Sequence, residues 1–343
     1  MGWSGVFFGR DLAVDLGSAN TRVYVRGEGV VLSEPSLVTV DLRSGAMVGC
    51  GLGAREMLGR APENLAVSHP IRGGIITDYE ATADMLRTFV SQAHSQRSLA
   101  RPRVILSVPT ALTGIERRAV EDAGYAAGAR RVYLIEEAMA AAVGMGLPIH
   151  EPAGTMVVSI GAGTTEVAVI SLGGIVASSS VGSAGLSIDA AVAEYVRREY
   201  SLVLGERTTE RLKHTIGSAF PSKEEPEAEV RGRDLVTGLP KNIVITAAEI
   251  REAIDPEIVA IVRAIRSTLD RTPPELAGDI MDRGIVLSGG SAALHGLARR
   301  LHHETRIRVH CGTAPAEAVV LGAGRCLEDF NALAPLLRNQ PRR

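Results

Sequence analysis

The chain is poor in cysteine and in aromatic residues, and it carries almost no net charge. Its 343 residues contain three cysteines, five Phe, six Tyr and one Trp, and the formal net charge is −2 at pH 7. Because Cys50, Cys311 and Cys326 share no metal-ligand spacing, we expect buried free thiols in a reducing compartment, without disulfides or a zinc site. The near-neutral charge and the scarce aromatics argue against nucleic acid as a partner.

Long apolar runs are missing as well. No stretch approaches the roughly 18 apolar residues that a membrane-spanning helix needs, and no basic start with an apolar signal core is present. The first ten residues, MGWSGVFFGR, nevertheless hold Trp3, Phe7 and Phe8. Aromatic side chains favour the bilayer interface. This segment is therefore either a weak membrane contact or a terminus that packs on its own domain or stays disordered.

What the chain does contain is one short segment in two divergent copies. Residues 14–25 read VDLGSANTRVYV and residues 158–169 read VSIGAGTTEVAV. Each copy predicts an apolar strand, a glycine turn with small polar residues, and a second strand with alternating β-branched residues. Such turns direct backbone N–H groups into one concavity that suits phosphate oxygens. Two copies predict two related halves that face one phosphate chain, with Asp15 of the first copy matched by Ser159 of the second.

Strands and helices alternate along the rest of the chain. Apolar strands are expected at 103–109 and 131–137, and the spacing of apolar residues predicts a helix from Ile115 to Ala127. A further helix should begin at Thr246, with Glu249 completing a capping box, and Pro256 should interrupt or kink it. This alternation predicts an α/β protein, with its ligand in the cleft between the halves.

Several motifs occur in a defined order along the chain: DLGSANTRVYV, PRVILSVP, RRVYLIEEAMAAA, TMVVSIGAGTTEVAVISLGGIV, GERTTERLK, EVRGRDLVTGLPK and RTPPELAGDIMDRGIVLSGG. In this order they resemble the actin superfamily and, within it, the bacterial rod-shape proteins of the MreB and Mbl family. The resemblance extends from Asp11 to about Glu328. It implies a duplicated actin/Hsp70-type ATPase fold, with two lobes and four subdomains around a nucleotide cleft.

The resemblance also implies where the lobes begin and end. Residues 1–150 would form the first lobe, with a small subdomain at about 33–71. Residues 151–325 would form the second lobe, with a small subdomain at about 186–242. Residues 326–343 would return to the first lobe and end in a frayed tail.

The phosphate and metal contacts follow from the same resemblance. Asp15 would reach the Mg²⁺ of bound ATP through water, because Mg²⁺ keeps several waters and takes few protein ligands. Small residues are needed where the backbone approaches phosphate closely. The residues implied in the two phosphate hairpins are Gly17, Ser18, Ala19 and Asn20 in the first, and Gly161, Ala162, Gly163 and Thr164 in the second.

At the nucleoside end, Glu210 and Lys213 match positions that hold ribose and base. The matching glycine turn consists of Gly289, Gly290, Ser291 and Ala292. For hydrolysis, Glu137 falls where the family orients the attacking water, with Glu136 as the second candidate, and Thr164 and Asp15 complete the catalytic set. Positioning water and bracketing phosphate charge is most of what phosphoryl transfer requires.

Each of these assignments has a simpler alternative. Asp15 would then be a strand-end carboxylate that faces solvent. Glu136 and Glu137 would cap the alanine-rich helix that follows, since acids favour a helix N-terminus. Glu210 and Lys213 would form a surface pair at i,i+3.

The chain departs from the family pattern where the chemistry would occur. The second hairpin of the family opens Asp-Ile-Gly-Gly-Gly-Thr, whereas this chain has Ser159 and Ala162 in the first and fourth positions. A Gly-Asp pair of the family is Gly185-Leu186 here, and Glu-Glu-Pro ends in Ala138. Loss of a carboxylate should weaken metal organisation, so we expect nucleotide binding with reduced or absent hydrolysis.

The resemblance implies a function as an actin-like, ATP-binding cytoskeletal protein. Its filaments would lie under the cytoplasmic membrane and guide cell-wall synthesis and cell shape. Its partners would be other copies of itself, the inner face of the membrane through Trp3, Phe7 and Phe8, and proteins of wall elongation or morphogenesis. The alternatives are a small-molecule kinase of the same fold and a plasmid-segregation filament.

Overall fold

Two five-stranded sheets form the centre of the computed structural model, which describes residues 11–93 and 101–338. The first sheet has the order β10-β9-β1-β2-β3 and the second has the order β13-β12-β11-β17-β18. The strands of the first sheet are β1 (Leu12–Leu16), β2 (Asn20–Val25), β3 (Gly29–Pro35), β9 (Arg103–Val108) and β10 (Arg131–Glu136). Those of the second are β11 (Thr155–Ile160), β12 (Thr165–Ser171), β13 (Gly174–Val181), β17 (Ile285–Ser288) and β18 (Val309–Cys311).

The two sheets have the same topology. In each, three consecutive antiparallel strands are joined by two strands that run parallel to the first of them. Strand β11 therefore corresponds to β1, β12 to β2, and β17 to β9. The α/β class and the duplication predicted from the repeated segment are both confirmed.

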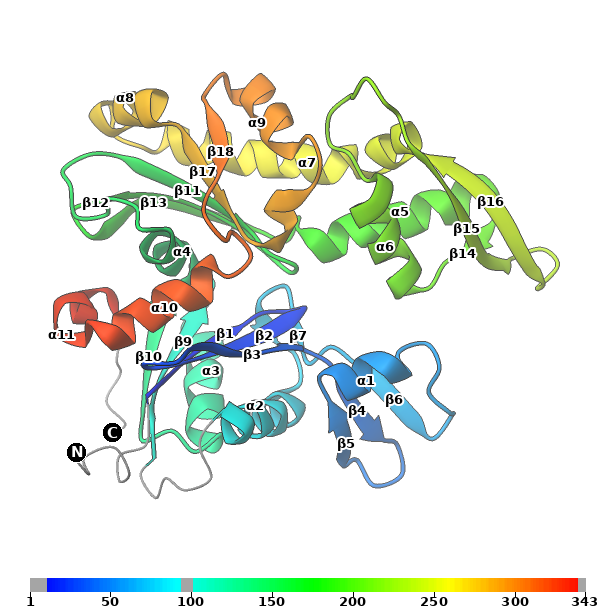
Figure 1. Cartoon of the computed structure of the whole chain (residues 1–343), viewed down its shortest axis with the longest axis horizontal. Helices are drawn as coiled ribbons and strands as arrows, with labels where there is room; N and C mark the ends of the chain where they lie inside the picture. Colours follow the sequence, from blue (N-terminus) through cyan, green and yellow to red (C-terminus); the bar gives the residue numbers. More distant parts are fainter. Residues whose placement is uncertain (1–10, 94–100, 339–343) are drawn as a thin grey trace.

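Two small three-stranded sheets extend from the same side of the molecule, one from each half (Figure 1). One has the order β5-β4-β6 and packs with helix α1, and the other has the order β14-β15-β16 and lies beside α5 and α6. The first group comprises β4 (Val38–Asp41), β5 (Met47–Cys50), β6 (Leu65–Ser68) and α1 (Leu52–Met57). The second comprises β14 (Leu202–Val203), β15 (Glu227–Asp234), β16 (Pro240–Thr246), α5 (Gly185–Tyr200) and α6 (Glu206–Ile216).

Helices cover the outer faces of the two large sheets, and two more lie between the sheets (Figure 1). The outer helices are α2 (Tyr79–Ala93) and α3 (Gly114–Ala126) on the first half, and α7 (Ala247–Asp270), α8 (Pro274–Arg283) and α9 (Leu297–Thr305) on the second. The inner helices are α4 (Glu137–Met145) and α10 (Ala318–Glu328). The short elements that remain are β7 (Ile71–Arg72), β8 (Ile75–Ile76), α11 (Phe330–Leu333) and the 3-10 turns η1 (Gly290–Ala293) and η2 (Ala334–Leu336).

The inner helices α4 and α10 touch through their backbones. A Cβ built on Gly322 would lie 1.8 Å from the carbonyl oxygen of Ala140, and one on Gly144 would lie 1.9 Å from that of Ala318. Only glycine permits this approach. The alanine-rich composition of α4 thus yields a thin, tightly packed layer to which both sheets attach.

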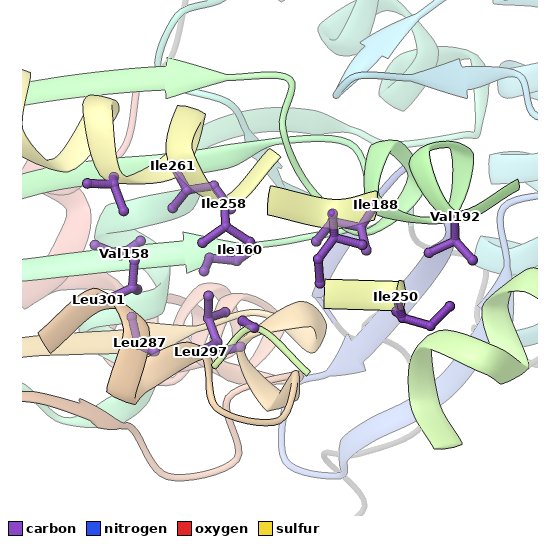
Figure 2. Close-up of a cluster of buried hydrophobic side chains, with 14 of the residues drawn as sticks. Val158, Ile160, Ile188, Val192, Ile250, Ile258, Ile261, Leu287, Leu297 and Leu301 are labelled. Carbon is purple, nitrogen blue, oxygen red and sulfur yellow. The ribbon is translucent and has the colours of Figure 1, made fainter. Parts of the chain in front are cut away.

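The alternation of side chains along the central strands decides which residues face this layer. On β1, Val14 belongs to the outer core of the first half, whereas Ala13 packs in the central layer. On β11, Val158 belongs to the outer core of the second half, drawn in Figure 2, and Val157 packs in the central layer. Because strand side chains alternate with period two, Asp15 points toward the layer between the halves, and so does Ser159.

Helix α7 begins as predicted but does not break. The Thr246 hydroxyl accepts a hydrogen bond from the Glu249 N–H at 3.3 Å, and the Glu249 carboxylate accepts one from the Thr246 N–H at 2.9 Å, so the capping box is confirmed. The helix then continues through Pro256 to Asp270, and the predicted interruption is wrong. A proline inside a helix costs about 3 kcal/mol, and burying one isoleucine contributes about 1.5–3 kcal/mol. The buried side chains of this face (Ile250, Ile254, Ile258, Ile261 and Ile265) therefore outweigh the proline.

The three cysteines differ in their exposure to solvent. Cys326 is buried, which raises the pKa of its thiol to about 12, but Cys311 is exposed, so the prediction of three buried thiols is wrong.

Over residues 11–93 and 101–338, no helix is both long enough and apolar enough to cross a membrane. Trp3, Phe7 and Phe8 lie outside the described residues.

Candidate nucleotide site

The two glycine hairpins meet between the halves. A Cβ built on Gly163 would lie 2.3 Å from the Ser18 hydroxyl and 3.0 Å from the Gly73 nitrogen. Ser18 also accepts a hydrogen bond from the Gly74 N–H at 3.0 Å. The second hairpin can therefore approach the first only because position 163 has no side chain.

The first hairpin is fixed by a serine on the segment that follows β3. The Ser36 hydroxyl donates to the Gly17 carbonyl at 2.6 Å, and the Ser36 N–H donates to the Ala19 carbonyl at 2.8 Å. A Cβ on Gly17 would lie 2.7 Å from the carbonyl oxygen of Asn20, the first residue of β2. The turn thus holds one backbone shape, which is what a preformed phosphate-binding loop requires.

The second hairpin is tied to helix α5 and to the glycine turn after β17. The Gly161 carbonyl accepts hydrogen bonds from the Gly185 N–H at 3.1 Å and from the Ser291 hydroxyl at 2.8 Å. The Ala162 carbonyl accepts one from the Leu186 N–H at 2.8 Å. Ser291 therefore supports the second hairpin from the side of the glycine turn that follows β17.

Asp15 is buried at the end of β1. Its carboxylate accepts a hydrogen bond from the Ser107 hydroxyl at 2.9 Å and pairs with the Arg22 guanidinium at 3.4 Å. Burial raises its pKa, and Arg22 and Ser107 partly offset the rise. Since only 8% of Asp15 is exposed, the alternative of a carboxylate that faces solvent is wrong.

Glu137 is the first residue of α4, in the layer between the halves. Its pKa is raised well above the ordinary value, first by burial and then by the negative charges of Asp15 and Glu166. Its neighbour Glu136 pairs instead with the Arg338 guanidinium at 2.7 Å, and its side chain forms no cap of the helix. A carboxylate with a raised pKa binds a proton more readily, which suits a general base.

Glu166 is an acid that sequence reasoning did not select. It is fully buried on β12, its Oε2 accepts a hydrogen bond from the Thr110 N–H at 3.1 Å, and its Oε1 accepts one from the Ser180 hydroxyl. Its cross-strand partner is Ser159. The signal in the sequence was an acid at an inward position of an otherwise apolar strand.

A cavity of about 370 Å³ lies at the other end of the site. It is lined by Lys213 of α6 and by Gly290 and Ser291 of the glycine turn. Other lining residues, which the sequence did not suggest, include His214 and His295. The volume is in the range of small-molecule pockets.

The glycine turn that forms one wall of this cavity is tightly built. Gly289 has a φ of 87°, and a Cβ there would lie 2.2 Å from the Ile160 carbonyl oxygen. At Gly290, by contrast, no atom lies within 4 Å of a Cβ position, so this residue opens onto free space. Ala292 is buried behind it.

Lys213 and Glu210 do not contact one another. The Lys213 ammonium donates to the Asp189 carboxylate at 2.8 Å and to the Gly185 carbonyl at 3.1 Å. The Glu210 carboxylate pairs with the Arg55 guanidinium at 3.0 Å and is not part of the cavity wall. The alternative of a simple surface pair within α6 is therefore wrong.

Two ion pairs join α6 to helix α1 and to the residue that follows β6 in the first half. One is Arg55–Glu210, and the other is His69–Glu206 at 3.6 Å, which lowers the pKa of Glu206. The small sheets of the two halves are therefore linked through their accompanying helices and loops.

The residues present fit a magnesium nucleotide better than a metal ion held by protein alone. Within residues 11–93 and 101–338, no group of three or more metal-binding side chains is found. Mg²⁺ usually takes one or two carboxylates and completes its shell with water and phosphate. Asp15 beside two glycine hairpins meets that requirement.

Two mixed five-stranded sheets of one topology, with opposed glycine hairpins between them, define an actin-like fold. Among solved structures, MreB5 of Spiroplasma citri bound to ADP has a TM-score of 0.90 and 33% identity, covering 95% of this chain and 98% of its own. The same protein bound to AMPPNP has a TM-score of 0.89. The structure called MamK double helical filament, at a TM-score of 0.77 and 20% identity, agrees in fold alone.

Sequence relatives identify the family. The cell shape-determining protein Mbl of Bacillus cereus is 42% identical over 326 residues, which is 95% of this chain and 98% of Mbl. The cell shape-determining protein MreB of Escherichia coli is 48% identical over 326 residues, 94% of each chain. A family model described as MreB/Mbl protein matches residues 9–335. The chain belongs to the MreB/Mbl family of cell shape-determining, actin-like proteins.

Proposed function

We propose that this chain is an ATP-binding subunit of membrane-associated filaments that guide cell-wall synthesis and thereby determine cell shape. The observation that carries the proposal is the direct approach of the two glycine hairpins, in which Gly163 leaves no room for a Cβ beside Ser18. A related MreB was solved with ADP and with AMPPNP, and MamK was solved as a double helical filament.

In this proposal the hairpins bind the phosphates through their backbone N–H groups. Asp15 orients the waters of Mg²⁺, which supplies charge neutralisation to the phosphates when it is bound. The nucleoside enters the cavity beside Lys213, and the glycine turn leaves room for it. Glu210 reaches the ribose only after its pair with Arg55 opens.

We further propose that hydrolysis is slow. Glu137 would hold the attacking water, since its raised pKa favours proton uptake. The second hairpin offers a neutral Ser159 where the family pattern has an acid. Phosphate would therefore be bound by many backbone groups, while the metal and water shell is less well ordered.

The membrane and partner assignments are also part of the proposal. Trp3, Phe7 and Phe8 would contact the inner face of the cytoplasmic membrane, and wall-elongation or morphogenesis proteins would bind the filament. The proposed lobes are 1–150 and 151–325, with 326–343 returning to the first. The bridge between Leu134 and Arg338 supports that return.

Sedimentation with nucleotide tests the filament, and calorimetry tests the site. We expect the purified chain to bind ATP in the presence of Mg²⁺ and to pellet with ATP or AMPPNP but much less without nucleotide. A small-molecule kinase would bind ATP and stay in the supernatant. Absence of any affinity for adenine nucleotides by calorimetry would overturn the proposed site.

A further inference from the structure

Glu166 is buried beside neutral hydrogen-bond donors. Its exposed fraction is 0%, and none of the ion pairs seen among residues 11–93 and 101–338 includes it. Its hydrogen-bond donors are a backbone amide and a hydroxyl, both neutral. An isolated buried charge is costly, and such exceptions to ordinary core composition are concentrated at functional sites.

The two donors come from different halves of the molecule. Ser180 lies on β13, which flanks β12 on the side away from β11, and there it is paired directly with Glu166. Thr110 follows β9 of the other large sheet, and its N–H reaches Glu166 at 3.1 Å. The carboxylate therefore joins the two halves directly.

This junction adjoins the glycine hairpins. A Cβ on Gly74 would lie 2.6 Å from the Pro109 side chain and 3.1 Å from the Thr164 side chain. The turn at Gly74, whose N–H binds Ser18, therefore lies against both the loop that holds Pro109 and the Thr164 end of the second hairpin. A shift of this loop would be transmitted to both phosphate hairpins.

The repeat relates Glu166 to a residue of opposite charge. Asp15 and Arg22 are cross-strand partners in the first hairpin, and Ser159 and Glu166 are the corresponding partners in the second. The first pair therefore combines a carboxylate with the cationic guanidinium of Arg22, while the second combines the neutral hydroxyl of Ser159 with a carboxylate. In the first hairpin the acid, Asp15, lies on the first strand, β1. In the second hairpin the acid, Glu166, lies on the second strand, β12.

We propose that Glu166 is a positioning residue of the nucleotide site, whose carboxylate holds the loop after β9 against the second hairpin and so keeps the two halves closed on the phosphates. This inference builds on the proposed function. A residue with no acceptor oxygen at position 166 leaves the Thr110 amide without its acceptor, and the closed arrangement becomes less populated. Nucleotide affinity then falls in proportion, because only the closed fraction binds tightly.

The first test is hydrogen exchange of the nucleotide-free protein. In Glu166→Ala we expect the amide of Thr110 to exchange about tenfold faster or more, the factor that corresponds to a hydrogen bond with a charged acceptor. Glu166→Gln retains an acceptor oxygen and should show a smaller increase. Ser180→Ala breaks only the bond within the second half, so Thr110 should keep its wild-type exchange rate.

The second test is the affinity for a fluorescent ADP analogue in the presence of Mg²⁺. We expect Glu166→Ala to weaken binding by about tenfold, Glu166→Gln to weaken it less, and Ser180→Ala to have the smallest effect. Equal exchange at Thr110 in the wild type and Glu166→Ala, or a larger loss of affinity in Ser180→Ala, overturns the inference. If the wild type binds no nucleotide while exchange responds as expected, the proposed function fails and the contact between the halves stands.

Discussion

Restoring an acid at position 159 is the sharpest perturbation of this site. Ser159 and Glu166 are cross-strand partners on the face that looks toward the central layer. Directly opposed residues in an antiparallel pair have Cβ atoms about 4.5–5.5 Å apart. In Ser159→Asp two carboxylates would therefore stand side by side, with Asp15 and Glu137 also near.

The magnitude follows from Coulomb's law. Two unit charges about 5 Å apart at an effective dielectric constant of about 20 repel by about 3 kcal/mol. That repulsion favours the uptake of a proton by one of the two carboxyl groups. Without metal, Ser159→Asp should therefore unfold at a lower temperature than the wild type at pH 7, and the deficit should shrink as pH falls and one carboxyl takes up a proton.

With Mg²⁺ and ATP the sign reverses. A cation held between the hairpins, as proposed above, would offset the repulsion, and groups around a metal's ligands commonly change activity by about tenfold to hundredfold. We therefore expect Ser159→Asp to release phosphate about tenfold faster than the wild type or more. Melting temperature in EDTA and in Mg²⁺-ATP, together with phosphate release, measures both parts.

Ser159→Asn is the matched control because it has the shape of aspartate without its charge. It should show neither the loss of stability in EDTA nor the gain in phosphate release. If Ser159→Asp and Ser159→Asn release phosphate at the wild-type rate, the missing acid is not what limits hydrolysis. If melting of Ser159→Asp does not depend on Mg²⁺-ATP, the assumed position of the metal is wrong.

Three further outcomes follow from the geometry. Gly163→Ala places a Cβ 2.3 Å from the Ser18 hydroxyl of the facing hairpin, so calorimetry should show loss of ATP binding. The control Gly182→Ala should bind ATP normally, because among the described residues no non-neighbouring atom lies within 4 Å of its Cβ position. Because the folded-state pKa of Glu137 is raised, the folded protein loses stability as pH rises from the unfolded pKa to the folded pKa and the carboxyl gives up its proton. The melting temperature of Glu137→Gln, which cannot ionise, should therefore rise relative to the wild type between about pH 5 and 8, and parallel curves would contradict this. Arg55→Ala removes an exposed ion pair with Glu210 that contributes less than about 1 kcal/mol, so the melting temperature should hardly change. Release of bound fluorescent ADP, followed by stopped-flow displacement, should become faster. An unchanged release rate would show that this pair does not retain the nucleotide.

Local sequence patterns were sufficient to predict where these helices lie along the chain. The helix predicted from Ile115 to Ala127 is observed as Gly114–Ala126, and the capping box at Thr246 forms as predicted. Both depend on neighbours within four residues along the chain, so a single sequence carries the information. Of the interruption or kink expected at Pro256, the interruption does not occur, because the buried face of α7 lies against elements far away in the sequence.

The pairing of charged side chains could not be read in the same way. Lys213 and Glu210 are neighbours on α6, yet one pairs with Asp189 and the other with Arg55. Glu166 depends on Thr110, which belongs to the other large sheet. In each case the partner is brought close by the packing of the two halves, and no spacing along the chain records it.

By itself the sequence determined the duplicated α/β plan, the two glycine hairpins and the loss of an acid at Ser159, because strand alternation and turn chemistry act over a few residues. The tertiary structure alone decided that Gly163 meets Ser18, that Glu137 lies near Asp15 and Glu166, and that Arg55 reaches Glu210. These contacts join residues that lie far apart in the sequence, so they arise only when the whole chain is packed.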